Sequence, residues 1–266
     1  MRYLRAGSGP PLVLLHGLLG YSFSWRHNLL ALAAQRTVYA PDQLGAGFSD
    51  RVPGLDCTLR AVASRTLEFL DTVGITEFDL LGTSHGGGVA ITMAGLLRES
   101  GDRRLRRLIL VAPINPWSPH GRRLAPFLSR RGIAKAFAWT MPRARFSHPY
   151  ILRRLYGDPR RISHGTLEGY AAPGRIPGTF EYALSVLGTW LEDLDELKQH
   201  LPALADVPTL LVWGAEDAAV YASSAESLHQ HLPNSKLVRY PGVGHLPYEE
   251  VPEEFNRTVL DFLEGQ

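Results

Sequence analysis

The strongest constraint on the fold is the alternation of short apolar runs with amphipathic segments. Apolar runs typical of buried strands occupy residues 11–17, 36–42, 78–84, 105–113, 208–214 and 235–242. Apolar residues at helical spacing fill the intervals at 24–35, 58–75, 85–100, 186–200, 223–231 and 251–264. Alternating strands and helices predict an α/β fold, with a mostly parallel sheet and helices on both faces.

One segment breaks this alternation. Residues 115–185 hold short aromatic and basic helical pieces, interrupted by Pro and Gly, with no convincing strand. The simplest organisation is one α/β core domain, residues 1–114 and 186–266, carrying an inserted helical cap at 115–185. Such sheets bind ligands beyond the carboxyl ends of their strands, so we expect the cap to form a lid over the site.

Composition narrows the classes of function. A formal net charge of +2 over 266 residues gives no reason to expect a nucleic-acid partner. Cys57 is the single cysteine, which excludes an internal disulfide and a cysteine-based metal site. No apolar run long enough for a signal peptide precedes Gly7, and no stretch of about 18 uncharged apolar residues follows. We therefore expect no membrane span and a cytoplasmic protein.

The segment GTSHGG, residues 82–87, places a Gly-x-Ser-x-Gly pattern where an apolar run turns into a helix. At such a tight turn, a Cβ at Gly82 or Gly86 would clash. Ser84 would be held in strained backbone geometry at the helix N-terminus, where the helix dipole favours a developing negative charge. This setting indicates a nucleophilic serine.

A serine nucleophile needs a general base, which a third group orients. His85 follows Ser84 around a sharp turn, so its side chain should point elsewhere and its backbone N–H should serve an oxyanion hole. His245 is the better base, because it follows the last expected strand in a glycine-shaped loop. Glu216 and Asp217 follow the preceding strand, and either carboxylate could hold the imidazole tautomer.

The order nucleophile, acid, base resembles that of the α/β-hydrolase superfamily. Five segments carry the resemblance: HGLLG (16–20), PDQLGAGFSD (41–50), GTSHGG (82–87), WGAED (213–217) and GVGH (242–245). The resemblance covers nearly the whole chain outside the cap. It implies that Asp217 rather than Glu216 is the acid, that Leu18 supplies the second oxyanion N–H beside that of His85, and that His16 has a structural role.

The N-terminus departs from this family pattern. Family members usually carry a β-hairpin before the strand that here spans residues 11–17, but only about ten residues precede it. The hairpin is therefore shortened, and we expect at most one short edge strand.

The residues around the expected site bear on the reaction class. Ser84 argues against the dehalogenases and epoxide hydrolases of the family, which need Asp there. Leu246 stands where hydroxynitrile lyases have Lys, and Thr83 where carbon–carbon bond hydrolases usually have Asn. The resemblance thus implies a serine hydrolase that cleaves carboxylic esters through an acyl-enzyme, with no metal or organic cofactor. Carbon–carbon bond hydrolysis, lactone hydrolysis and non-catalytic ligand binding stay open as alternatives.

The cap is strongly basic. Residues 118–175 contain eleven arginines and one lysine against Asp158 and Glu168. One interpretation is that these arginines cover the outer face of the cap or contact a second subunit, so that an oligomer is possible. The other is that one or two face the pocket and select a small-molecule ester with an anionic group. The aromatic residues expected beside them are Phe137, Trp139, Tyr156 and Tyr170.

Overall fold

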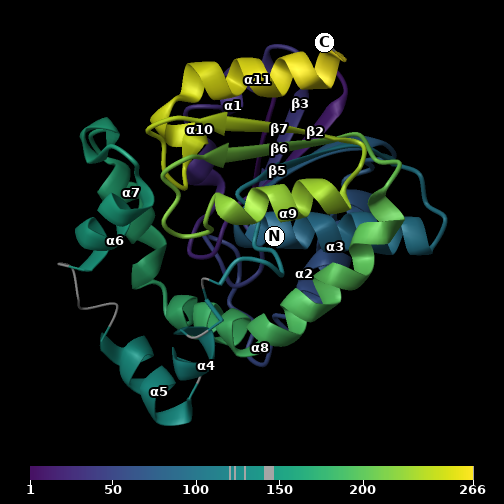
Figure 1. Cartoon of the computed structure of the whole chain (residues 1–266). Coiled ribbons are helices and arrows are strands. Elements are labelled where there is room, and N and C mark those ends of the chain that lie inside the picture. Colours follow the sequence, from purple (N-terminus) through teal and green to yellow (C-terminus); the bar gives the residue numbers. More distant parts are fainter. Residues whose placement is uncertain (120, 123, 129, 141–146, 266) are drawn as a thin grey trace.

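The computed structural model describes residues 1–265 except 120, 123, 129 and 141–146. Within these residues one seven-stranded sheet has the order β1-β3-β2-β4-β5-β6-β7 (Figure 1). Its strands are β1 (Tyr3–Ala6), β2 (Pro11–Leu15), β3 (Thr37–Pro41), β4 (Phe78–Thr83), β5 (Leu105–Val111), β6 (Thr209–Gly214) and β7 (Ser235–Tyr240). Every pairing among β2–β7 is parallel, which confirms the predicted α/β class.

The edge beside β3 holds the short strand that replaces a full hairpin. β1 pairs antiparallel with β3, with Tyr3 opposite Pro41 and Ala6 opposite Val38. Its side chains alternate between exposed and half-buried, as expected of an edge strand. The expectation of at most one short edge strand is confirmed.

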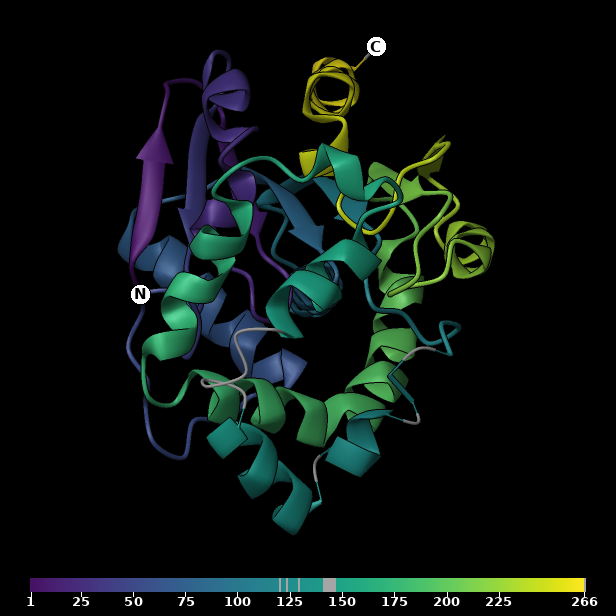
Figure 2. The same ribbon diagram turned by 90° about the vertical axis from the view of Figure 1, so that its left-hand side faces the viewer.

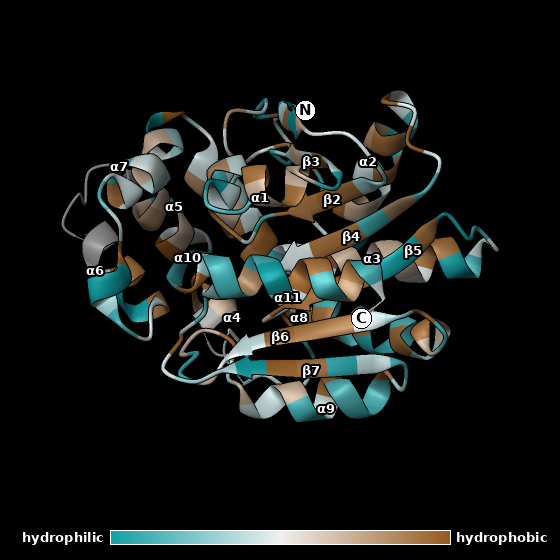
Figure 3. Ribbon diagram, turned by 90° about the horizontal axis from the view of Figure 1, so that it is seen from above, coloured by the Kyte–Doolittle hydropathy of each residue, from teal (hydrophilic) through white to brown (hydrophobic). Residues whose placement is uncertain are grey.

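Helices cover both faces of the sheet (Figures 1 and 3). On one face lie α2 (Leu59–Thr72), α3 (His85–Glu99), α8 (Thr179–His200) and α9 (Ser223–His231). On the other lie α1 (Leu29–Ala33) and α11 (Pro252–Glu264). Successive strand residues point to opposite faces, so Val13 and Leu15 join the first core while Leu12 and Leu14 join the second. Burial on both sides explains why these strands are continuous apolar runs.

The segment between β5 and α8 is helical in the residues described. It contains α4 (Leu124–Leu128), α5 (Arg131–Thr140), α6 (Ser147–Leu155) and α7 (Thr166–Ala171). These helices lie beyond the carboxyl ends of the strands (Figures 1 and 2). α8 begins at Thr179, after Gly178 with φ 92°, so the helix predicted over 186–200 starts earlier than expected.

α8 joins the inserted segment to the core. It contacts α4 and α5, and Leu194 and Leu197 near its end are buried against the first face of the sheet. The predicted boundary at 185/186 therefore falls inside a continuous helix, and the division into core and cap stays a prediction.

Candidate active site

Ser84 lies between β4 and α3 with φ 53° and ψ −120°, a region that side-chain-bearing residues rarely adopt. The flanking glycines make the turn possible. A Cβ on Gly82 would lie 2.3 Å from the carbonyl oxygen of Gly86, and a Cβ on Gly86 would lie 2.4 Å from that of His16. Ser84 thus lies on a tight strand-to-helix turn. The turn requires glycine at positions 82 and 86, because the neighbouring backbone leaves no room there for a Cβ.

His245 and Asp217 meet from neighbouring loops, after β7 and β6. Nδ1 of His245 lies 2.8 Å from Oδ2 of Asp217, and both side chains are buried. The other carboxylate oxygen of Asp217 accepts from the backbone N–H groups of Ala219 and Val220, at 2.8 and 2.9 Å. A carboxylate only accepts, so Nδ1 donates and Nε2 is left as the acceptor. Glu216, by contrast, is exposed.

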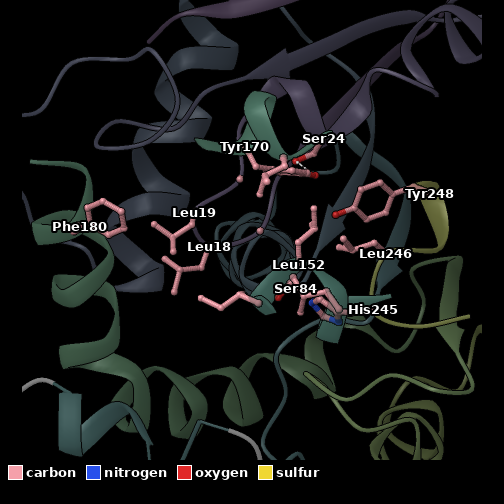
Figure 4. A pocket seen from close by; sticks show the side chains of 15 residues that line it. Leu18, Leu19, Ser24, Ser84, Leu152, Tyr170, Phe180, His245, Leu246 and Tyr248 are labelled. Carbon is pink, nitrogen blue, oxygen red and sulfur yellow. Dashed lines mark hydrogen bonds between the residues drawn. The ribbon is translucent and has the colours of Figure 1, made fainter. Parts of the chain in front are cut away.

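Ser84 and His245 lie side by side (Figure 4). Both residues line two cavities. Gly17 packs against the serine, since a Cβ there would lie 3.1 Å from Cβ of Ser84. Among the described residues, the Ser84 hydroxyl makes no hydrogen bond to the imidazole. Such bonds often tighten only when a substrate binds.

Two backbone donors flank the serine. Leu18 follows Gly17 in the loop after β2, and His85 is the first residue of α3. Neither N–H donates to any residue that the structure describes. Unpaired N–H groups beside a serine, one of them at a helix N-terminus, suit the stabilisation of an oxyanion.

The side chains of His85 and His16 do not act as bases in this arrangement. Burial, with a smaller contribution from His16, lowers the pKa of His85 to about 3, so its imidazole is neutral. The side chain lines neither cavity at Ser84. Nδ1 of His16 contacts the carbonyl oxygen of Gly17 at 2.9 Å, and Nε2 accepts from the N–H of Gln43 at 3.1 Å. These bonds are the loop-holding contacts expected of a structural histidine.

The two cavities, of about 180 and 210 Å³, share Ser84, His245, Leu18 and Leu155. The smaller one, termed the apolar chamber, is lined by Leu19, Ile151, Leu152, Leu167, Phe180 and Leu246, among others. The larger one, termed the Trp190 chamber, is lined by Ile114, Ser118, Leu187, Trp190, Leu194 and Val220, among others. A substrate held at Ser84 thus has a separate space on each side.

Of the two interpretations of the cap arginines, the one that places them on the outer face fits the arginines whose side chains the structure describes. All are exposed and none lines either chamber: Arg122, Arg130, Arg153, Arg154, Arg160, Arg161 and Arg175. Long charged side chains stay hydrated unless they are paired, which accounts for their outward position. Arg123, Arg143 and Arg145 lie outside the described residues, as does the side chain of Arg131.

The four aromatic residues expected beside these arginines differ in their positions. Tyr170 lines the apolar chamber and Tyr156 is buried. Phe137 is half-buried against Phe180, and Trp139 is 65% exposed. Only Tyr170 of the four therefore borders the space at Ser84.

Sequence reasoning missed two buried carboxylates in α10 (Pro247–Glu250). Glu249 accepts from the hydroxyl groups of Tyr156, at 2.5 Å, and Tyr170, and pairs with Arg26 at 2.8 Å. It thereby joins α7, the segment before α1 and the residue that follows α6.

Glu250 accepts from three backbone N–H groups, those of Gly157, Asp158 and Gly244. Gly244 directly precedes His245, so this carboxylate ties the base loop to the chain that follows α6. Adjacent glutamates before a proline are typical of a solvated surface, and no local signal marks this pair as buried.

Comparisons with known proteins place this fold in a family. A family model described as the Alpha/beta hydrolase family matches residues 12–258, and the chain therefore belongs to this family of hydrolases. The chain is 30% identical to the dihydrolipoyllysine-residue acetyltransferase component of an acetoin cleaving system from Pseudomonas putida, over 99% of this chain and 66% of the relative. It is 28% identical to a pimeloyl-[acyl-carrier protein] methyl ester esterase from Nitrosomonas europaea, over 94% of each.

Among solved structures, the epoxide hydrolase CorEH superposes with a TM-score of 0.84. That match covers 99% of this chain and 94% of the other at 24% identity, so it supports the fold alone. No helix in the described part of the chain is both long and apolar enough to cross a membrane.

Proposed function

We propose that this hydrolase cleaves carboxylic esters through an acyl-enzyme formed on Ser84. His245 is the general base, Asp217 orients it, and the N–H groups of Leu18 and His85 form the oxyanion hole. The observation that carries the proposal is the 2.8 Å contact between His245 and Asp217, placed beside a strained serine at the junction of two chambers.

The steps follow from the positions of these groups. Oγ of Ser84 attacks the ester carbonyl carbon while Nε2 of His245 takes its proton, and the carbonyl oxygen becomes an anion held by the two N–H groups. The imidazolium then gives its proton to the alcohol oxygen as the carbon–oxygen bond breaks. Water attacks the acyl-enzyme in the same way, which releases the acid and restores the serine.

Three considerations favour ester substrates. The chambers on either side of Ser84 suit a molecule with one group on each side of the reacting carbonyl, as an ester has. The relative from Nitrosomonas europaea, similar over 94% of both chains, is named as a methyl ester esterase. An alkoxide leaving group also demands less of the site than an amine.

A panel of short-chain esters, assayed for acid release, tests this function. Ser84→Ala should lower kcat by about 10³-fold or more while the far-ultraviolet circular dichroism spectrum stays unchanged. An alkyl fluorophosphonate should label the wild-type chain once, at Ser84, by mass spectrometry of peptides. Retention of more than a tenth of kcat in Ser84→Ala would rule out this nucleophile, and binding of esters without turnover would favour the ligand-binding alternative.

A further inference from the structure

The Trp190 chamber contains two polar atoms that no described residue satisfies. Oγ of Ser118 and Nε1 of Trp190 are both buried and have no hydrogen-bond partner among the described residues. Ser118 is 3% exposed as a residue, and both residues line the chamber. Leaving a buried polar group unpaired costs about 1–3 kcal/mol, so two such groups on residues that line one cavity point to an absent partner.

Ser118 is held in place by Asn115, which has no hydrogen-bonding capacity to spare. The amide nitrogen of Asn115 donates to the carbonyl oxygen of Pro113 and to Oγ of Ser224, both at 3.0 Å. Its amide oxygen accepts from the N–H groups of Trp117 and Ser118, both at 3.1 Å. Asn115 thus fixes the turn that carries Ser118, while the Ser118 hydroxyl itself stays available.

The ring nitrogen of Trp190 packs against Gly121. Gly121 has φ 83°, and a Cβ there would lie 2.7 Å from Nε1 of Trp190. Any larger residue at 121 would be strained and would press on the indole N–H. An indole N–H only donates, so its missing partner must be an acceptor.

The described lining of the Trp190 chamber contains no lysine or arginine. A carboxylate there would meet no lysine or arginine among the described lining residues, and burying a charge without such a partner is strongly unfavourable. A neutral oxygen acceptor, such as an ether, ketone or hydroxyl oxygen, suits such donors without that penalty. The apolar chamber differs, because the phenol oxygen of Tyr170 there is already bonded to Ser24 and Glu249.

We propose that the Trp190 chamber is a subsite that binds a neutral oxygen acceptor of the substrate through Ser118 and Trp190, while the apolar chamber takes a hydrocarbon group. This inference rests on the proposed ester hydrolysis at Ser84. It narrows the substrate class to esters that carry an additional acceptor oxygen in either the acyl or the alcohol group, but not in both.

Three isosteric esters test the subsite: butyl pentanoate, butyl 3-methoxypropanoate and 2-methoxyethyl pentanoate. Each ether replaces one methylene by an acceptor oxygen, on the acyl or the alcohol side. The measured quantity is the kcat/KM of each ether divided by that of butyl pentanoate. For one of the two ethers, this ratio should be about 2- to 10-fold lower in Ser118→Ala than in wild type. The separate variant Trp190→Phe should lower the same ratio in the same range. The ether that responds identifies which side of the ester occupies the chamber.

Ser24→Ala is the matched control, because it removes a hydroxyl from the apolar chamber and should leave that ratio within twofold. Thermal unfolding checks each variant, and Ser118→Ala decides alone if Trp190→Phe does not fold. If wild type turns over the esters and Ser84→Ala does not, but the ratios for both ethers are the same in Ser118→Ala as in wild type, the subsite is wrong and the proposed ester hydrolysis is retained. Absence of turnover for all three esters would overturn both.

Discussion

The backbone N–H of His245 donates a 2.7 Å hydrogen bond to the carbonyl oxygen of Leu155, the last residue of α6. The side chain of Leu155 lines both chambers. One bond therefore joins the proposed base to the end of α6, and a shift of α6 would displace the imidazole. The carboxylate of Glu250 reinforces this link, because it binds the N–H groups of Gly157 and Gly244.

Glu250→Ala should destabilise the fold and lower kcat. The change leaves three buried N–H groups without their acceptor, for an expected loss of about 2–5 kcal/mol in the free energy of unfolding. Urea denaturation and ester turnover measure the two effects. Glu253→Ala, at an exposed position of α11, is the control and should change neither. Equal urea midpoints for the two variants would contradict the anchoring role of Glu250.

Asp217→Asn should reduce kcat by about 10³- to 10⁴-fold, because an amide at this position favours the wrong imidazole tautomer. Glu216→Gln should change kcat less than about twofold, since this neighbouring side chain is exposed. Steady-state kinetics of both variants on one ester give the comparison. A larger loss in Glu216→Gln would mean that the acid had been assigned to the wrong residue of the loop.

His85→Gln and His245→Gln should distinguish the roles of His85 and His245. Glutamine at 85 keeps the backbone N–H of the proposed oxyanion hole, so kcat should stay within about tenfold of wild type. Glutamine at 245 removes the base, and kcat should fall by about 10³-fold or more. Comparable losses in both variants would require a direct chemical role for the imidazole of His85.

The stability of the fold should decrease with acid partly through His85. Its pKa is about 3 in the folded chain, against 6.5 for an unperturbed histidine, so between these values the unfolded chain binds a proton that the folded chain does not. Its contribution is fully present above pH 6.5 and declines as the pH falls, by up to about 1.4 kcal/mol per pH unit.

Urea denaturation at pH 7.5 and pH 5 measures this dependence. The difference in unfolding free energy between the two pH values should be smaller in His85→Gln than in wild type. His231→Gln, on an exposed side chain, should behave as wild type does. An unchanged difference in His85→Gln would mean that His85 is not held neutral by burial.

The sheet could be predicted from sequence because its strands are buried on both faces and therefore stand out as apolar runs. The spacing of apolar residues predicted the wrong local structure where tertiary packing determines the backbone conformation. Residues 24–35 have helical spacing but form a short turn at Ser22–Trp25 and then α1, because Trp25 is fully buried and Asn28 donates to Tyr248 and Asn256. These contacts come from more than 200 positions along the chain, and no local pattern reports them.

The positions of Ser84, Asp217 and His245 could be predicted because each follows a strand of one parallel sheet, and such strands end at the same edge. Glu249 and Ser118 could not be predicted. Glu249 is buried in contact with Tyr156, 93 positions away, and with Tyr170 and Arg26. The role proposed for Ser118 depends on Trp190, which α8 places at the same cavity.

The backbone of Ser84 has a consequence for how the chain would change under selection in the laboratory. Glycine adopts φ 53° freely, whereas serine is strained there by about 1–3 kcal/mol. The residue that the proposed chemistry needs is thus not the residue that the turn favours. Ser84→Gly should resist heat better than the wild-type chain while losing turnover. A library sorted for heat tolerance alone would then drift away from the nucleophile, so any thermostabilised variant of this protein needs sorting for turnover in the same round.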